Sequence, residues 1–427
     1  MSQYRAYPAY KDSGVEWIGQ VPEHWKVARV KRLASLRNER RNDVSTDTIY
    51  IGLEDVEAGS GQYKPTNGSS RQSEDSTVGI FYEGDVLYGK LRPYLRKAII
   101  SEMAGCCSTE FLVLRAEKTE PRWLQEWLLT PDVTHQIESG CEGAKMPRAD
   151  WGHIGSIEVV YPDQPEQAQI LTTLDRETAR IDALIEKKNR FIELLKEKRQ
   201  ALITHAVTKG LDPNAKMKDS GVEWIGPVPE HWDVVPSTWL FVESKERAHE
   251  DDQHLSATQK YGVISLAEYE RLEGRQVTHA VKNLEQRKHV KLDDFVISMR
   301  SFQGGIERVK ALGCVRSSYV VIQAGDGADK NYFAYLFKSG SYIQGLQATS
   351  SFIRDGQDLN YGNFRQVRLP KPGSDEQMQI AKFLDQETAR IDALARTTEQ
   401  SITLLKERRA AFITAAVTGQ IDLRGKQ

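Results

Sequence analysis

The chain has 427 residues, of which 39% are hydrophobic and 28% are charged, and its formal net charge is −2. This composition is typical of globular proteins, and the length allows two or more domains with cores of their own. No run of about 18 apolar residues occurs, which excludes a membrane-spanning helix. The near-neutral charge argues against a chain that binds nucleic acid over its whole surface, so such contacts would need local clusters of cations or help from partner subunits.

The cysteines give no sign of a metal or redox site. Cys106, Cys107, Cys141 and Cys314 form no CxxC pair, and no histidine lies at a zinc-site spacing from them. The first ten residues lack the apolar segment of a signal peptide. We therefore expect a reduced, cytoplasmic setting and no contact with a membrane.

In chain order, the first element is a 15-residue motif that occurs twice, which we call the frame motif. Residues 11–25 read KDSGVEWIGQVPEHW, and residues 218–232 differ from them only by Pro227 in place of Gln20. Its tryptophan and histidine side chains suit base stacking, but identical copies would give both halves of the chain the same preference. We therefore interpret the motif as structural packing, and we assign no catalytic or metal-binding role to its histidines.

The first insert, Lys26–Pro165, follows the first frame motif and has 140 residues. A turn and a strand are expected over Gly84–Tyr88, a buried strand over Phe111–Leu114, and a short helix over Pro121–Leu129. This alternation predicts a mixed α/β domain.

The densest basic segment of the first insert is residues 90–97, which carry four cations, one aromatic residue and no acid. Arginine suits guanine edges and phosphates, and lysine suits phosphates; the alternative is an ordinary solvated surface. The candidate DNA contacts in this segment are Lys90, Arg92, Tyr94, Arg96 and Lys97. The later loop KMPRADW (residues 145–151) adds Arg148.

A long helix is expected next. Residues 166–184 (EQAQILTTLDRETARIDAL) match residues 376–394 (EQMQIAKFLDQETARIDAL), and the similarity continues through 194–208 and 404–418. Apolar residues recur near a and d heptad positions, and neither copy is interrupted by glycine or proline. At 1.5 Å per residue each helix is roughly 60 Å long. We predict that the two helices pair in antiparallel fashion; the alternative is that each helix caps its own domain.

The second insert, Asp233–Asp375, has 143 residues and lies between the second frame motif and the second long helix. Strands are expected over Asp294–Arg300 and Tyr319–Ile322. The first strand leads into SFQGG, where paired glycines allow close approach of the backbone to a ligand. A polar loop follows at Ser351–Asp355. The candidate DNA contacts of this insert are Arg300, Ser301, Gln303 and Arg354.

Two closely similar frames thus surround two inserts in which we find no mutual similarity. A repeated frame is expected to meet the same kind of partner twice, whereas unlike inserts are expected to meet two different targets. Duplication followed by drift is the alternative, but drift would have eroded the frames and the inserts alike.

No enzymatic motif is present. The sequence has no P-loop, no glycine-rich nucleotide or methyl-donor turn, no HExxH and no GxSxG. Glu186 and Lys188 form the Glu-x-Lys pattern of metal-dependent nucleases, but they lie on the predicted long helix, where a surface charge pair is the simpler interpretation. We predict no catalytic, cofactor-binding or metal-binding residue.

In combination, these motifs resemble the specificity subunits of type I restriction–modification systems. The segments that carry the resemblance are WIG-x-VPEHW in both frame motifs, GDVLYGKLRPYLRK (residues 84–97), MPRADW (146–151), ISMRSFQGG (297–305) and the two ETARIDAL helices. They span nearly the full length of the chain. Each motif alone is moderately specific, and together they are highly specific.

The resemblance implies a fold and a division of labour. Residues 1–165 and 213–375 would form two α/β target recognition domains, each reading one half of a split site in double-stranded DNA. Residues 166–212 and 376–427 would form an antiparallel coiled coil that separates them. Two modification subunits, carrying S-adenosylmethionine, and restriction subunits, using ATP and Mg²⁺, would dock on this frame. The chain itself would be non-catalytic and would hold no cofactor.

Three other functions stay open from the sequence. An enzyme with an unrecognised site would show turnover by the isolated chain. A scaffold or adaptor with protein-binding inserts would show no salt-dependent affinity for DNA. A specificity subunit of a related type II-like system would bind DNA in the same way, but its neighbouring genes would differ.

Overall fold

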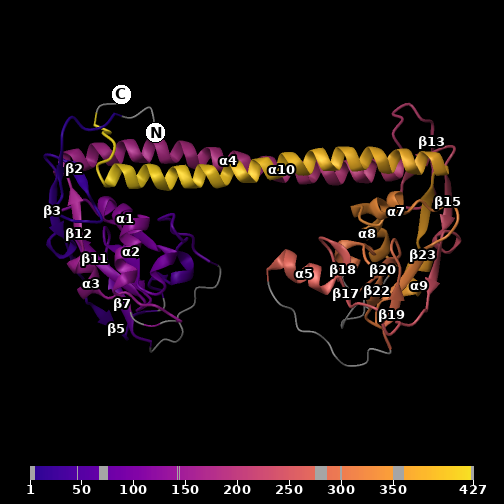
Figure 1. The fold of residues 1–427 in the computed structure, drawn as a ribbon, viewed down its shortest axis with the longest axis horizontal. Coiled ribbons are helices and arrows are strands. Elements are labelled where there is room, and N and C mark those ends of the chain that lie inside the picture. Colours follow the sequence, from indigo (N-terminus) through magenta and orange to yellow (C-terminus); the bar gives the residue numbers. More distant parts are fainter. Residues whose placement is uncertain are drawn as a thin grey trace. The chain divides into compact units, whose positions relative to one another are not determined.

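The structure, a computed structural model, describes residues 5–45, 47–66, 76–141, 143, 145–274, 286–298, 301–349 and 360–424. The chain divides into two compact units (Figure 1). Unit 1 comprises Met1–Lys188 and Gln400–Gln427, and unit 2 comprises Asn189–Glu399. Each unit therefore contains one frame motif, one insert and part of each long helix. Within the described ranges, no helix has both the length and the hydropathy needed to cross a membrane.

Each frame motif folds into a short antiparallel hairpin. The hairpins are β1 (Tyr10–Asp12) with β2 (Gln20–Pro22), and β13 (Met217–Asp219) with β14 (Pro227–Pro229). In the first, the Asp12 carboxylate accepts a hydrogen bond from the backbone N–H of Gly14 at 2.9 Å, and Gly14 has a φ of 74°. This left-handed conformation favours glycine, and Gly221 adopts it in the second copy with a φ of 67°.

The two ends of each insert are paired by a two-stranded antiparallel ladder. In unit 1, β3 (Lys26–Arg29) pairs with β12 (Glu158–Tyr161), and in unit 2, β15 (Asp233–Pro236) pairs with β24 (Arg368–Lys371). The first strand of each ladder directly follows the frame motif, and the second directly precedes a long helix. Each insert is thus closed at its base by its own first and last strands.

The insert of unit 1 contains two four-stranded sheets, in the orders β4-β11-β8-β9 and β5-β7-β10-β6. The strands are β4 (Ala34–Leu36), β5 (Arg40–Arg41), β6 (Tyr50–Ile51), β7 (Val78–Phe81), β8 (Val86–Gly89), β9 (Ala98–Ile100), β10 (Gly105–Cys107) and β11 (Phe111–Ala116). Strand β8 is buried on both faces. Val86 and Tyr88 pack in the cluster that contains the helices, whereas Leu87 packs in the cluster that contains the second sheet, as the two-residue period of a strand requires.

Three short helices complete the insert of unit 1: α1 (Pro121–Leu129), α2 (Pro131–Ser139) and α3 (Trp151–Ser156). Proline occupies the first position of α1 and of α2, where its missing N–H has no helical partner to lose. The helix predicted over residues 121–129 is confirmed with the same bounds.

The insert of unit 2 has a four-stranded sheet in the order β16-β23-β20-β21 and the pairs β17-β18 and β19-β22. The strands are β16 (Phe241–Ser244), β17 (Leu255–Thr258), β18 (Gly262–Ser265), β19 (Lys288–Val290), β20 (Phe295–Ile297), β21 (Glu307–Arg308), β22 (Gly313–Val315) and β23 (Val320–Ala324). The four-stranded sheet is antiparallel throughout and corresponds in order to β4-β11-β8-β9 of unit 1. The two inserts therefore share a sheet topology that their sequences do not reveal.

Helices cover the sheet of unit 2 and bury an aromatic core. They are α5 (Leu266–Glu273), α6 (Ser301–Gly304), α7 (Lys330–Leu336), α8 (Gly340–Gln347) and α9 (Tyr361–Gln366). Phe241 of β16 lies within 6 Å, between ring centroids, of each of four other phenylalanines, and all five rings are fully buried. Edge-to-face contacts of this kind add to the stabilisation from buried area.

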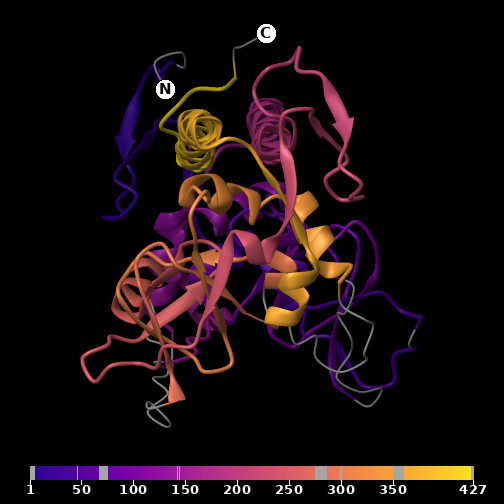
Figure 2. The same ribbon diagram turned by 90° about the vertical axis from the view of Figure 1, so that its right-hand side faces the viewer.

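The two long helices are α4 (Gln164–Lys209), with 46 residues, and α10 (Ser374–Val417), with 44 residues. In unit 1, Ile170, Leu171 and Leu174 near the start of α4 pack in one cluster with Phe412–Val417 at the end of α10. This contact requires the helices to run antiparallel, and they lie side by side in Figure 1 and Figure 2. Gly210, with a φ of 75°, follows α4 and supplies the left-handed residue that commonly ends a helix.

Two equivalent ion pairs join the helices, one in each unit. In unit 1, Arg409 Nε lies 3.0 Å from an Asp182 carboxylate oxygen, and in unit 2, Arg199 Nε lies 3.1 Å from an Asp392 oxygen. Both the arginines and the aspartates are 210 residues apart, so the repeated sequence makes the same contact twice. The predicted fold class, mixed α/β domains with a long antiparallel helix pair, is confirmed.

Candidate nucleic-acid interface

Glu166, in the first turn of α4, holds the frame motif of unit 1. Its carboxylate accepts hydrogen bonds from the Tyr7 hydroxyl at 3.0 Å and the Trp25 indole N–H at 3.1 Å, and it lies 2.7 Å from His24 Nε2. A negative charge at this end of a helix also interacts favourably with the helix dipole. Burial and the adjacent carboxylate raise the pKa of Tyr7, so its hydroxyl remains a donor at neutral pH.

Glu376 repeats this arrangement at the start of α10. Its carboxylate lies 2.9 Å from His231 Nε2 and accepts a hydrogen bond from the Trp232 indole at 2.9 Å. Trp25 and Trp232 are both fully buried, which leaves neither ring face free for a base. This burial supports structural packing as the role of Trp25 and Trp232, and we call each Glu–His–Trp group a joint.

The residue after each joint glutamate fixes the insert. Gln167 accepts hydrogen bonds from the Thr119 hydroxyl and the Glu120 backbone N–H, and Gln377 accepts one from the backbone N–H of Asp329. Both glutamines are fully buried. The repeated Glu-Gln pair therefore connects the frame motif, the long helix and the insert. Sequence reasoning missed this role, although the identity of the pair in both copies was a usable signal.

Two segments predicted separately as DNA contacts in the first insert lie side by side. The backbone N–H of Arg92 donates to the Pro147 carbonyl at 2.8 Å, the N–H of Ala149 donates to the Lys90 carbonyl at 2.9 Å, and Leu91 forms an antiparallel bridge with Arg148. Cations some 56 residues apart in the chain thus share one surface, which we call the basic surface of unit 1.

The side chains of residues 90–97 do not all face outward. Arg92 and Tyr94 are exposed, and Lys90 is half-buried. By contrast, Lys97 Nζ donates to the Leu53 carbonyl at 2.5 Å, and a guanidinium nitrogen of Arg96 lies 3.4 Å from the Leu129 carbonyl. Those two cations hold the backbone of neighbouring segments. The segment turns because Arg92 and Arg96, on either side of the turn at Pro93–Leu95, adopt left-handed φ angles of 53° and 47°.

Arg148 faces solvent at the rim of the basic surface. Its Nε and Nη2 atoms donate to the two carboxylate oxygens of Glu110, at 3.2 and 3.0 Å. The Arg148 side chain is 51% exposed, and exposed ion pairs contribute little stability. The pair therefore orients a guanidinium that remains accessible to an anionic ligand.

In unit 2, the candidates have different placements. Arg300 and Arg354 lie outside the described residues. Ser301 is fully buried, and its hydroxyl oxygen accepts a hydrogen bond from the Ser298 backbone N–H at 3.0 Å. Its predicted role as a surface donor to DNA does not fit this position, because the hydroxyl serves the backbone of the turn. Gln303, two residues later, is exposed.

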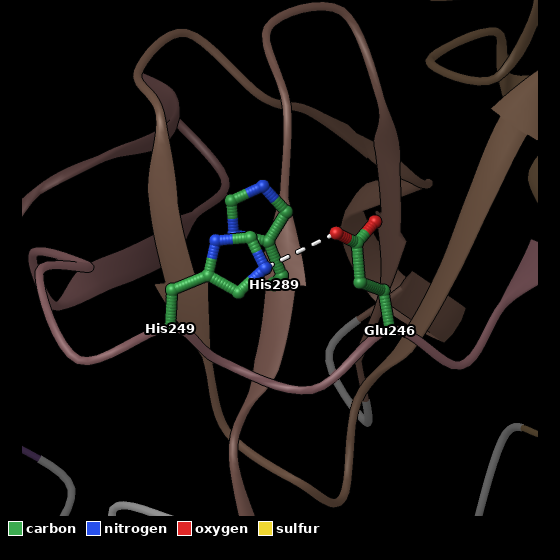
Figure 3. A group of neighbouring side chains, drawn as sticks. All are labelled: Glu246, His249 and His289. Atoms are coloured by element: carbon green, nitrogen blue, oxygen red, sulfur yellow. Dashed lines mark ion pairs between the residues drawn. The ribbon is translucent and has the colours of Figure 1, made fainter.

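A histidine cluster lies elsewhere in unit 2. Figure 3 shows Glu246, His249 and His289, which have potential ligand atoms within 4.8 Å of one another. However, the two imidazole rings are stacked at 4.2 Å with planes 13° apart, so their in-plane lone pairs cannot converge on one ion. Lys291 Nζ also lies 2.9 Å from the Glu246 carboxylate. The arrangement as it stands is a packed charge cluster rather than a formed metal site.

Asp252 completes this cluster and predicts an acid sensitivity of unit 2. Burial alone would raise the pKa of Asp252, but hydrogen bonds from His289 and from the His249 backbone outweigh burial and lower it. A lowered carboxyl pKa stabilises the fold above the ordinary aspartate value of about 4, and this contribution disappears as the pH falls below it. We expect urea midpoints to fall more steeply below pH 4 in the wild type than in Asp252→Asn. Parallel curves for the two proteins would contradict this expectation.

Comparisons with known proteins place these features in context. No protein-family model matches the chain. The specificity subunit of the type I restriction enzyme EcoDI from Escherichia coli is 22% identical over 205 residues, which cover 47% of this chain and 46% of that subunit. That match thus spans about half the length of each protein. The putative type I restriction enzyme MjaX specificity subunit from Methanocaldococcus jannaschii is 21% identical over 427 residues, covering 95% and 96%.

Two solved structures share the fold. A chain from a structure of complex assembly and conformational transition in the type I restriction–modification system superposes with a TM-score of 0.67 at 17% identity, covering 93% of this chain and 98% of that chain. The HsdS subunit from Thermoanaerobacter tengcongensis gives a TM-score of 0.52 at 18% identity, covering 94% and 98%. In sequence and in fold, the chain is therefore similar to the specificity subunits of type I restriction–modification systems, as its repeated motifs predict.

Proposed function

We propose that the chain is the DNA-reading specificity subunit of a type I restriction–modification complex, in which each unit reads one half of a split target. One observation carries this proposal. Equivalent joints hold two inserts with equivalent sheets, but the turns that follow the equivalent strands β8 and β20 present different side chains: Lys90 and Arg92 in unit 1, and Gln303 in unit 2. Equivalent joints and sheets that present different contact residues suit the binding of two different base sequences.

The repeated helices supply a surface for the same partner twice. Leu184 and Leu404 in unit 1, and Leu394 and Leu194 in unit 2, are 43–64% exposed and are pairwise 210 residues apart. Exposed leucines at equivalent positions of a repeat support docking of two copies of one subunit. We assign these copies to the modification subunits, which would bring S-adenosylmethionine. The restriction subunits, with ATP and Mg²⁺, would join the same complex, and this chain would contribute no catalytic group.

The experiment that tests this function is co-expression of the chain with its neighbouring modification subunit, followed by mapping of methylated adenines across the host genome. We expect a motif with two short specific blocks around a fixed gap. Exchange of residues 26–165 for another first insert should change one block only. Absence of methylation from a soluble, assembled complex would contradict the proposal and leave a protein-binding scaffold as the better account.

Arg92→Ala tests the basic surface directly. Arg92 is exposed beside Arg148, so its removal from the assembled complex should weaken DNA binding about 5- to 150-fold if it contacts a base, or lower the salt-dependence slope by about 1 if it contacts a phosphate. Fluorescence anisotropy against salt concentration measures both. Arg29→Ala, an exposed arginine on β3 outside the basic surface, is the matched control. Equal affinity and slope for Arg92→Ala and wild type would remove Arg92 from the interface.

A further inference from the structure

The four-residue helix α6 presents a single side chain to solvent. Ser301 and Phe302 are buried, Gln303 is exposed and Gly304 has no side chain. The turn is closed by hydrogen bonds from the Ser298 N–H to the Ser301 hydroxyl and from the Gly305 N–H to the Ser301 carbonyl, both at 3.0 Å. Among the residues of α6, Gln303 is therefore the one whose side chain is exposed, and the two residues before it are buried.

The carbonyl groups of the residues before and after Gln303 are held by other elements. The Phe302 carbonyl accepts a hydrogen bond from Gln347 Nε2 of α8 at 2.5 Å, and the Gly304 carbonyl accepts one from Lys338 Nζ at 2.8 Å. Gly305 has a φ of 76°, and a Cβ atom there would lie 2.1 Å from the Phe337 carbonyl oxygen. The turn thus packs closely against the residue after α7, and no side chain fits at Gly305.

Lys338 is itself held by a buried partner. Its ammonium pairs with Glu307, a residue 3% exposed, whose second carboxylate oxygen has no partner among the described atoms. Burial lowers the pKa of Lys338 and raises that of Glu307, and the pairing opposes both shifts. Buried ion pairs generally contribute little net stability compared with apolar side chains of similar size. Because Lys338 also donates to the Gly304 carbonyl, we explain the Lys338–Glu307 pair by the need to fix the turn that carries Gln303.

We propose that Gln303 reads an adenine in the half-site of unit 2, and that Lys338 and Gln347 are its positioning residues; this rests on the proposed DNA-reading function. A glutamine amide offers one donor and one acceptor, which match the N7 acceptor and N6 donor of adenine in the major groove. Such a bidentate contact depends on orientation, so a backbone fixed on both sides favours it. A phosphate contact needs only one donor and no fixed orientation.

Gln303→Ala and Gln303→Glu in the assembled complex separate these possibilities through the methylation map. In Gln303→Ala, one adenine position of the unit 2 block should lose about 5- to 150-fold discrimination, while the unit 1 block stays unchanged as an internal control. In Gln303→Glu, the preference at that position should move toward cytosine, because a carboxylate accepts from cytosine N4. A uniform loss at all sites, with an unchanged motif, would instead assign Gln303 to a phosphate and overturn the inference.

The positioning role needs a variant that stays folded. Lys338→Met combined with Glu307→Leu removes both charges of the pair together, which avoids leaving the buried Glu307 carboxylate unpaired. With unchanged far-ultraviolet circular dichroism, this double variant should relax the same base position as Gln303→Ala and no other. Full discrimination in the double variant would overturn the positioning role. If the wild type itself shows no split motif, the proposed function fails; if the wild type shows one and the Gln303 variants leave it unchanged, only this inference fails.

Discussion

Glu166→Ala is expected to lower the free energy of unfolding of unit 1 by about 3–5 kcal/mol, because a buried donor that loses its acceptor costs about 1–3 kcal/mol. The substitution leaves the Trp25 indole and the Tyr7 hydroxyl without their shared carboxylate, and both side chains are buried. It also removes the partner of His24. The effect should be measured by urea denaturation, with hydrogen exchange to locate it at the frame motif and the start of α4.

Two further variants serve as controls for Glu166→Ala. Glu186→Ala changes an exposed glutamate on the same helix and in the same unit and should stay within about 0.5 kcal/mol of the wild type. Glu376→Ala changes the second joint, where the carboxylate is 29% exposed and fewer donors depend on it, so a smaller loss in unit 2 is expected. Equal stabilities for Glu166→Ala and Glu186→Ala would show that the joint does not hold the frame motif of unit 1.

Phe241→Ala should destabilise unit 2 by about 3–5 kcal/mol, the usual cost of removing a buried phenylalanine side chain. Phe241 is fully buried, and its ring centroid lies 5.1 Å from that of Phe333 and 5.2 Å from that of Phe337. The cavity left behind would be lined by aromatic rings that cannot all move inward. Urea denaturation monitored by tryptophan fluorescence should show the unfolding transition at a lower urea concentration. The amides of β16 should lose protection from hydrogen exchange.

Val242→Ala is the matched control, because Val242 follows Phe241 on the same strand but is 63% exposed. It should change stability by no more than about 0.5 kcal/mol. If the two variants unfold at the same urea concentration, the aromatic cluster is not the stabilising core of this unit.

The long helices were the most predictable part of the fold. Their heptad pattern and the absence of glycine and proline are local properties, so the sequence predicted starts within two residues of those observed for α4 and α10. The residues that form ion pairs between the two long helices were not predictable in the same way. Many charged residues line each helix, and only the antiparallel register selects Asp182 for Arg409.

The sequence also predicted those strands that have a strongly apolar local pattern. Residues predicted as strands coincide largely with β8, β11 and β23. Two-residue strands such as β5 and β6 carry too little pattern to detect. The bridge between Leu91 and Arg148 depends on contacts between segments that are distant in the chain. The sequence therefore indicated residues 90–97 and 145–151 as candidates, but it did not predict that these two segments meet.

Side-chain direction was the main limit for the candidate site. The density of cations in residues 90–97 does not show which of these side chains face solvent. Arg92 is exposed, whereas Lys97 donates to a backbone carbonyl. The left-handed backbone at Arg92 and Arg96 redirects the segment in a way that no period of two or 3.6 predicts. Likewise, Ser301 has the right chemistry for DNA but lies on the inner side of its turn.

The ladders that close the inserts have a consequence for how such chains diversify. Each insert begins and ends on paired strands, β3 with β12 or β15 with β24, and each is fastened by an equivalent Glu-Gln dipeptide. A genetic crossover at these strands exchanges a whole insert while its closing ladder and its anchors stay intact. A chain that receives a new insert in this way would keep the strand pairing and the glutamine contacts that hold the other insert.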